Sequence, residues 1–201
     1  MTQDNRSNII GNDGLLTILI PGTEWQRFGG WTPSSNGLFG YGVEGCTKLL
    51  AWGPSGNNDR DRIAGAEKLR GMIAAHQFAP GAKLNVIAHS HGGNVALAAS
   101  HLGLAREIDC LITLNKPQMD GAVYRPGKNI RSFYNISTKG WDWIQHGGSA
   151  TRGHYKTDPH AMNKTIDISS SKLKAHAALI WDDAIREMWW AWFLEQQSTP
   201  R

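Results

Sequence analysis

Short apolar runs that end at turn residues recur along the chain and predict strands. "LLTILI" stops at Pro21-Gly22, "CTKLLAW" stops at Gly53-Pro54, and "KLNVIA" stops at a polar His-Ser-His stretch. Runs of this length, bounded by Gly, Pro and polar residues, are typical of buried strands. The expected strands are Leu15–Ile20, Cys46–Trp52, Lys83–Ala88, Ile108–Asn115, Ile130–Ser137 and, from a weaker pattern, Thr165–Ser169.

Three further segments repeat apolar residues at helical spacing. The first spans residues 57–76, with Asn58 or Asp59 as its N-cap. The second, residues 92–104, is short and mostly apolar, and the third covers residues 175–196. The spacing in the third places on one stripe Trp181, Ile185, Met188, Trp189 and Trp192. Strands that alternate with helices predict a largely parallel sheet with helices on both faces.

The composition is that of one folded domain. The chain has 201 residues, of which 40% are hydrophobic and 19% charged, enough for one substantial core. We find no repeat and no low-complexity linker, so residues 1–201 are expected to form a single domain, with residues 1–13 as a loose N-terminal segment.

Charge and hydropathy narrow the expected surroundings of the protein. The net charge of +4 comes from scattered Lys and Arg, which does not favour a nucleic-acid partner. No apolar run reaches the ~18 residues of a membrane span, and the polar N-terminus lacks the apolar core of a secretion signal. A cytoplasmic location is therefore expected, with export by a dedicated route left open. The sequence sets no oligomeric state.

Nine tryptophans are the unusual feature of the composition. In the C-terminal helical segment, Trp190 and Phe193 fall off the apolar stripe, and if exposed they would suit peripheral contact with a membrane, whose interface favours Trp. The alternative is a wide apolar face that docks on the sheet and makes both residues core.

A serine between two histidines, in "NVIAHSHGGNVAL", is the strongest candidate for chemistry. Ser90 directly follows an apolar strand pattern and directly precedes an apolar helix pattern. This is the context of a nucleophile elbow, whose tight turn requires small residues two before and two after the serine; Ala88 and Gly92 fill these positions. The free N–H groups at the start of the following helix would stabilise an oxyanion.

This stretch has two other interpretations. His89 and His91 form a His-x-His pair that could begin a zinc site, but such a motif needs an acid and another His immediately downstream, where Gly93 and Asn94 stand. The other alternative is a glycine-containing turn with a serine that takes no part in chemistry. We therefore expect no metal.

With this elbow, the sequence resembles the α/β-hydrolase superfamily, in its small lipase- and esterase-like branch. The resemblance implies an α/β-hydrolase fold with a mostly parallel sheet of five or six strands and a minimal lid domain or none. It also implies a catalytic triad in the chain order Ser, Asp or Glu, His, which requires no cofactor.

The resemblance assigns the other two triad members to positions after later strands. The acid would be Asp142, the only carboxylate in the loop behind "IRSFYNIS", with Asp120 as the alternative. The base would be His176, just before the closing helix, with His154 and His160 as alternatives. An aspartate there would fix the imidazole tautomer and stabilise the imidazolium.

The oxyanion hole would be built from main-chain donors. By the resemblance, the Thr23 N–H joins that of His91, with the neighbouring Glu24 as an alternative donor. The aromatic- and Gly-rich segment 22–45 leaves the carboxyl end of a strand and would form a substrate-side loop, with Glu24 and Trp25 among its binding residues. His89 would lie beneath the site.

The expected activity is hydrolysis of a carboxylic ester, by an esterase, lipase or phospholipase acting on a small acyl ester or lipid. A peptidase or amidase could use the same triad, because the triad does not select the leaving group. The third alternative is a non-catalytic binding module with the same fold.

Overall fold

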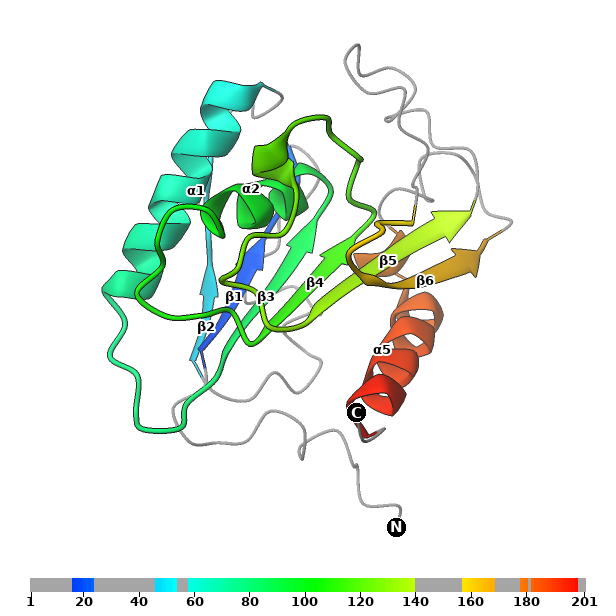
Figure 1. Ribbon diagram of the computed structural model, residues 1–201. Coiled ribbons are helices and arrows are strands. Elements are labelled where there is room, and N and C mark those ends of the chain that lie inside the picture. The colour runs from blue at the N-terminus through cyan, green and yellow to red at the C-terminus, as the bar shows by residue number, and fades with distance from the viewer. Residues whose placement is uncertain are drawn as a thin grey trace.

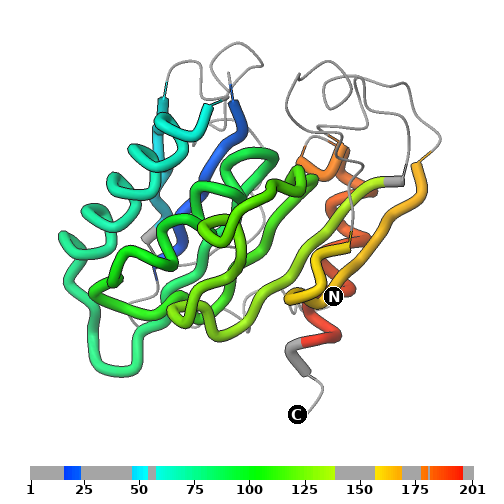
Figure 2. Tube along the Cα trace, turned by 45° about the horizontal axis from the view of Figure 1, so that its top comes forward, coloured from blue at the N-terminus to red at the C-terminus, as the bar shows by residue number. Residues whose placement is uncertain are grey.

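The computed structural model describes residues 16–23, 46–53, 58–139, 157–168, 178–180 and 182–198. These residues contain a six-stranded sheet in which every pair of neighbours is parallel. The strands are β1 (Leu16–Ile20), β2 (Cys46–Leu49), β3 (Leu84–His89), β4 (Cys110–Leu114), β5 (Phe133–Lys139) and β6 (Met162–Asp167). Their order across the sheet is β2-β1-β3-β4-β5-β6, and all carboxyl ends lie at the same edge (Figures 1 and 2).

Helices cover both faces of the sheet, as the alternation of patterns predicts. One face carries α1 (Asp59–Ala74) and α2 (His91–Ala99), while α5 (Asp183–Ser198) lies on the other (Figure 1). Strand β1 shows why: Ile18 points into the core beneath α1 and α2, and its neighbour Leu19 points toward α5. Strands with two covered faces read as continuous apolar runs, which is the pattern in the sequence.

The start of α1 confirms the predicted cap. Asn58 has extended backbone angles, and its side chain accepts a hydrogen bond of 2.8 Å from the Asp61 N–H. This satisfies one of the free N–H groups of the first turn.

The C-terminal helix differs from the sequence prediction. Residues 178–180 are helical, but Asp182 is not, and α5 begins at Asp183. Of the predicted stripe, Ile185 and Trp189 are buried as expected, whereas Met188 is 53% exposed. Trp190 and Phe193, which were expected off the stripe, are buried as well.

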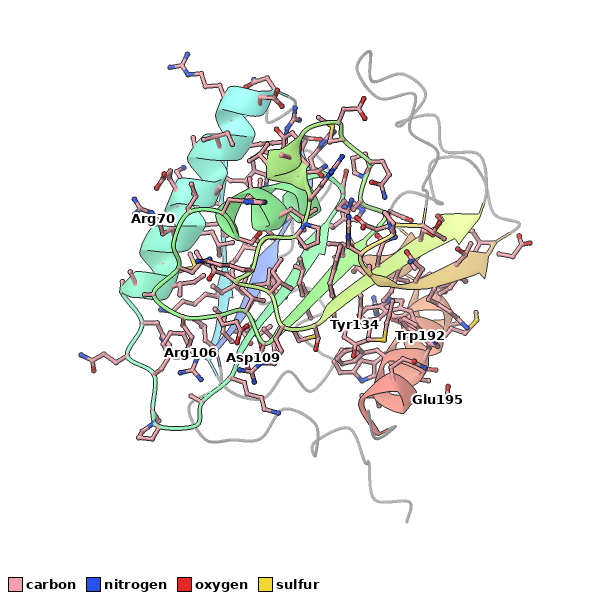
Figure 3. The ribbon with its side chains drawn as sticks, viewed as in Figure 1. Arg70, Arg106, Asp109, Tyr134, Trp192 and Glu195 are labelled. Atoms are coloured by element: carbon pink, nitrogen blue, oxygen red, sulfur yellow. The ribbon has the colours of Figure 1, made fainter. Side chains whose placement is uncertain are left out.

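The buried face of α5 is wider than the predicted stripe, because it adds Trp190 and Phe193 to Ile185 and Trp189. This is the wide apolar face, docked on the sheet, that the alternative prediction described. Trp181, the first residue of the predicted stripe, lies outside the described residues. Tyr134 of β5 meets the rings of Phe193 and Trp192 edge to face, at centroid distances of 5.1 and 6.0 Å. Figure 3 shows Tyr134 and Trp192 side by side between the sheet and α5. The surface that Trp190 and Phe193 would offer to a membrane is therefore not formed. No helix in the described part of the chain is long and apolar enough to cross a membrane.

Strand β6 begins three residues before the weak pattern that predicted Thr165–Ser169. Its first half is polar because these side chains bond across the sheet. Asn135 of β5 donates a hydrogen bond of 3.0 Å to the Asn163 side chain, and the Ser137 and Thr165 hydroxyls lie 3.3 Å apart. Hydrophobic periodicity does not register a strand of this kind.

Candidate active site

The elbow lies where β3 ends at His89 and α2 begins at His91. Ser90 between them has φ 51° and ψ −132°, a conformation that residues other than glycine rarely adopt. Two hydrogen bonds hold it: its N–H donates to the Leu114 carbonyl (2.8 Å), and its carbonyl accepts from the Gly93 N–H (3.0 Å). Its hydroxyl makes no capping bond to α2. The strained turn therefore holds a serine whose hydroxyl is not used to cap the helix.

Close backbone approach explains the glycines around Ser90. A Cβ on Gly92 would lie 2.5 Å from the Pro21 carbonyl oxygen and closer still to that of Ile20. A Cβ on Gly22 would lie 2.8 Å from the Ser90 Cβ and 3.4 Å from its Oγ. The loop after β1 and the elbow thus pack closely against each other.

A buried tryptophan holds this loop from the other side. Trp52, 3% exposed, donates a hydrogen bond of 2.7 Å from its indole N–H to the Pro21 carbonyl. Thr23, the predicted oxyanion donor, follows two residues later in a turn. Its role as a donor stays a prediction.

Both elbow histidines are buried, each 8% exposed. His89 lies against the loop, since a Cβ on Gly22 would be 3.2 Å from its Nδ1. The Nδ1 of His91 faces Arg62 and Asn94, at 3.4 and 3.3 Å. His89 therefore lies against the loop after β1, and one ring nitrogen of His91 faces two partners. The predicted role of His89 beneath the site stays a prediction.

A charged cluster lies next to His91. The Asp59 carboxylate accepts hydrogen bonds from the Tyr124 hydroxyl (2.5 Å) and from Arg62 (2.7 Å). These two bonds, that of Tyr124 first, hold the pKa of Asp59 below its ordinary value. Burial raises the pKa of Tyr124, and its bond to Asp59 adds to the rise. The phenol is therefore a fixed hydroxyl donor to the carboxylate at neutral pH.

Sequence reasoning missed this cluster and Trp52. On this helix the apolar Ile63 is 36% exposed, whereas the charged Arg62 is only 3% exposed. The signal in the sequence is the helical spacing of Arg62. This spacing places Arg62 on the same side of α1 as the buried residues Ala66, Leu69 and Ile73. A charged residue in that phase indicates a buried partner.

The predicted acid and base, Asp142 and His176, lie outside the described residues, as do the alternative base His154 and the predicted binding residues Glu24 and Trp25. The assignments of these residues stay predictions.

The alternatives Asp120 and His160 are both described and exposed. His160 stands two residues before β6, at the amino end of that strand, whereas Ser90 follows the carboxyl end of β3. Two strands, β4 and β5, separate β3 from β6. The roles of Asp120 and His160 as alternatives stay predictions.

A search of the described residues for three or more His, Cys, Asp or Glu side chains that could hold a metal ion finds none.

Two solved structures show the same fold over most of the chain. An acyl-protein thioesterase 2 from Zea mays matches with a TM-score of 0.52 and 12% identity, covering 92% of this chain and 94% of its own. A metagenomic carboxyl esterase, MGS0156, matches with a TM-score of 0.50 and 13% identity, covering 85% of this chain and 67% of its own. No protein-family model and no curated protein matches the sequence. The all-parallel sheet, the serine turn between β3 and α2 and these two likenesses together establish that the chain has the α/β-hydrolase fold.

Proposed function

We propose that the protein is a serine hydrolase that cleaves carboxylic esters through Ser90, His176 and Asp142. The observation that carries this proposal is the strained Ser90, with φ 51°, between β3 and the start of α2. Strain of this kind persists where the surroundings enforce it, and it clusters at reactive sites. Here Gly22 and Gly92 let two backbones close around the serine.

The parallel sheet supports the proposed acid and base. β5 ends at Lys139, three residues before Asp142, and β6 ends at Asp167, nine residues before His176. Because all six strands run the same way, both residues follow strand ends at the edge that carries Ser90. Ligands and reacting groups gather at this edge in α/β proteins.

In the proposed reaction, His176 takes the Ser90 proton as Oγ attacks the ester carbonyl carbon. The carbonyl oxygen becomes an oxyanion, stabilised by the N–H groups of His91 and Thr23 and by the positive end of α2. Collapse breaks the bond to the alcohol, which leaves with the proton from His176. Water then attacks the acyl-enzyme with His176 as base and releases the acid and free Ser90.

The proposed substrate is a small acyl ester or a lipid. One of the two structural neighbours is named as an acyl-protein thioesterase and the other as a carboxyl esterase. Hydrolysis of an ester and of a thioester requires the same attack and the same oxyanion hole, so a thioester belongs in the same assay panel.

The test compares two serines at opposite ends of α2. Ser90→Ala should lower turnover of a short p-nitrophenyl ester by at least ~10³-fold and abolish labelling by a fluorophosphonate. Ser100, buried at the C-cap of α2, bonds the Leu97 carbonyl and the Gly127 N–H. Ser100→Ala should retain turnover and labelling while losing some stability.

Mass spectrometry of the labelled wild type should place the adduct on Ser90. Turnover of amides but not esters would favour the peptidase or amidase alternative. A wild type that neither labels nor hydrolyses any ester, thioester or amide would replace the proposal with a non-catalytic module.

A further inference from the structure

Arg62 and Asn94 meet at His91, the second histidine of the elbow, and Tyr124 bonds Arg62 behind them. The proposed reaction leaves these side chains without a role. Arg62 comes from α1, Asn94 from α2 and Tyr124 from η3 (Ala122–Tyr124), a single 3₁₀ turn. All three residues are buried, Arg62 being 3% exposed. Burial of a guanidinium is costly unless its donors are satisfied, so its position beside the elbow requires a reason.

The contacts of His91 determine which ring nitrogen carries its proton. Its Nδ1 lies 3.4 Å from Arg62 Nη1 and 3.3 Å from Asn94 Nδ2. A guanidinium only donates. Asn94 Nδ2 also lies 3.1 Å from the Pro117 carbonyl oxygen, which only accepts, so the NH₂ side of the amide faces both groups. With a donor on each side, Nδ1 must be the acceptor, and the proton is on Nε2.

Arg62 is itself fixed. Its Nε donates to the Tyr124 hydroxyl oxygen at 3.1 Å, and its Nη2 lies 2.7 Å from Asp59 Oδ1. The same carboxylate oxygen accepts the Tyr124 hydroxyl at 2.5 Å. All three nitrogens of the guanidinium therefore have partners, and the group that faces His91 cannot rotate away without breaking two further bonds.

We infer that Arg62 is a positioning residue for the nucleophile elbow, holding His91 as the neutral Nε2–H tautomer and holding its backbone N–H at the oxyanion position. The role of that N–H rests on the proposed function, whereas the tautomer does not. Arg62 thereby links α1 to the first turn of α2. It also keeps Nδ1 of His91 from accepting the Ser90 proton, which leaves the base to a distant histidine.

The chain supplies a matched control on the same helix. Arg70 forms an ion pair with Glu67, three residues earlier on α1 (2.7 Å), just as Arg62 does with Asp59. The Arg70 side chain, however, is 50% exposed. Figure 3 shows Arg70 on the side of α1 that faces away from the sheet. Arg62→Met should lower kcat for the p-nitrophenyl ester by about 10-fold or more with KM within about twofold, because a displaced oxyanion donor weakens transition-state binding. Arg70→Met should leave both constants unchanged.

A conservative pair separates charge from geometry. Arg62→Lys keeps a cation but lacks the planar fork, so it should recover only part of the lost kcat. Full recovery by Arg62→Lys would overturn the geometric part of the inference. Arg70→Lys should behave as wild type.

Imidazole nitrogen shifts from ¹⁵N NMR test the inference without any assay of activity. In the wild type His91 should show the Nε2–H tautomer alone. In Arg62→Met only the Asn94 NH₂, 3.3 Å away, still donates to Nδ1, so some Nδ1–H tautomer should appear, and less of it in Arg62→Lys, whose ammonium also only donates. An Nδ1–H tautomer in the wild type, or Arg62 variants with wild-type shifts and fluorophosphonate labelling, would overturn it. If the wild type showed neither ester turnover nor fluorophosphonate labelling, the proposed function would be overturned instead. The NMR result would still decide the tautomer of His91.

Discussion

At the scale of single residues, the site is defined by where a side chain is absent as much as by where one is present. Gly92 gives the Pro21 carbonyl room to reach the elbow, and Gly22 lies against Ser90 itself. In neither case is the nearest atom the far end of a flexible side chain, so a substitution cannot be absorbed by a change of rotamer. The glycines are therefore positions at which stability and reactivity change together.

Gly92→Ala is expected to lower the free energy of unfolding by about 2–4 kcal/mol, because its methyl group would overlap two backbone carbonyls. It should also slow fluorophosphonate labelling of Ser90, since the loop and the elbow must separate. Gly71→Ala is the control: no atom lies within 4 Å of the added Cβ, and the helix should gain about 0.5–1 kcal/mol. Urea unfolding checks both values, and equal effects at the two positions would contradict the packing argument.

Tyr124→Phe tests the bond that most lowers the pKa of Asp59. An Asp with a lowered folded-state pKa adds stability that is present above its ordinary value of 3.8 and is lost as the pH falls through the lowered one. At pH 7 the variant should be less stable than wild type by about 1 kcal/mol, a small cost because the carboxyl is largely exposed. The difference should shrink below pH 3.8, as urea unfolding between pH 7 and 3 would show. A difference that stays constant with pH would show that the cost comes from the buried Arg62 Nε–H, which loses the Tyr124 oxygen as its acceptor, and not from Asp59.

The sequence predicted the role of Ser90 but not that of Arg62. The reason is that the residues that mark the serine are adjacent in the chain, whereas the partners of Arg62 are far from it in the chain. The serine, its small neighbours and the adjoining strand and helix are contiguous, so a local pattern carries them. Arg62 meets His91 and Tyr124, which are 29 and 62 residues away. Local periodicity does not contain such a contact, and a charged residue on α1 reads as part of a solvated face.

At the scale of elements, α1 supports both halves of the proposed oxyanion hole. Arg62 contacts the elbow, and one turn later Gly65 lets Trp52 approach, since a Cβ there would lie 3.0 Å from the Trp52 Cβ. Trp52 in turn holds the Pro21 carbonyl. The helix thus ties the loop after β1 to the first turn of α2, although it contributes no reacting group.

Trp52→Phe keeps most of the ring and removes the indole N–H. The buried Pro21 carbonyl then loses its donor, which should cost about 1–3 kcal/mol of stability and slow labelling of Ser90. Trp189→Phe gives the cost of a comparable loss on the opposite face, because Trp189 is fully buried and donates to the Leu179 carbonyl at 2.9 Å. Labelling of Trp52→Phe at the wild-type rate would show that the loop keeps its place without this bond.

Elements with local signals were predicted well, and those set by distant partners were not. The cap at Asn58 and the apolar cores of β1, β3 and β4 follow from adjacent residues. The width of the buried face of α5 depends on how the helix meets the sheet, and the polar start of β6 depends on Asn135 of another strand. Periodicity alone contains neither fact.

At the scale of the whole molecule, parallel strands bring the ends of β1, β3, β5 and β6 to one edge, which is why a triad can be assembled from distant segments. The segment that leads into β6 is held to the rest of the sheet by a buried ion pair. Lys116, two residues after β4, has its Nζ 3.3 Å from Oδ2 of Asp158, which lies four residues before β6, and both side chains are buried. Burial lowers the pKa of Lys116, and the attraction of Asp158 offsets only part of that effect.

Removing either charge of this pair should be worse than removing both. Lys116→Met leaves a buried carboxylate and Asp158→Asn a buried ammonium, so each should cost about 3–5 kcal/mol, whereas the double variant should cost far less than their sum. Asparagine preserves an acceptor for the His160 N–H, now 3.0 Å from Asp158 Oδ1, so the comparison isolates the charge. The exposed pair of Arg131 with Glu107, at 2.8 Å, serves as control and should show coupling below about 1 kcal/mol.

Because the lowered pKa of Lys116 disfavours its charged form, the cost in Asp158→Asn should fall as the pH rises toward 10.5, the ordinary value for lysine. Additive single costs in urea unfolding would mean that the two residues stabilise the fold independently and that the segment before β6 is held by its backbone contacts.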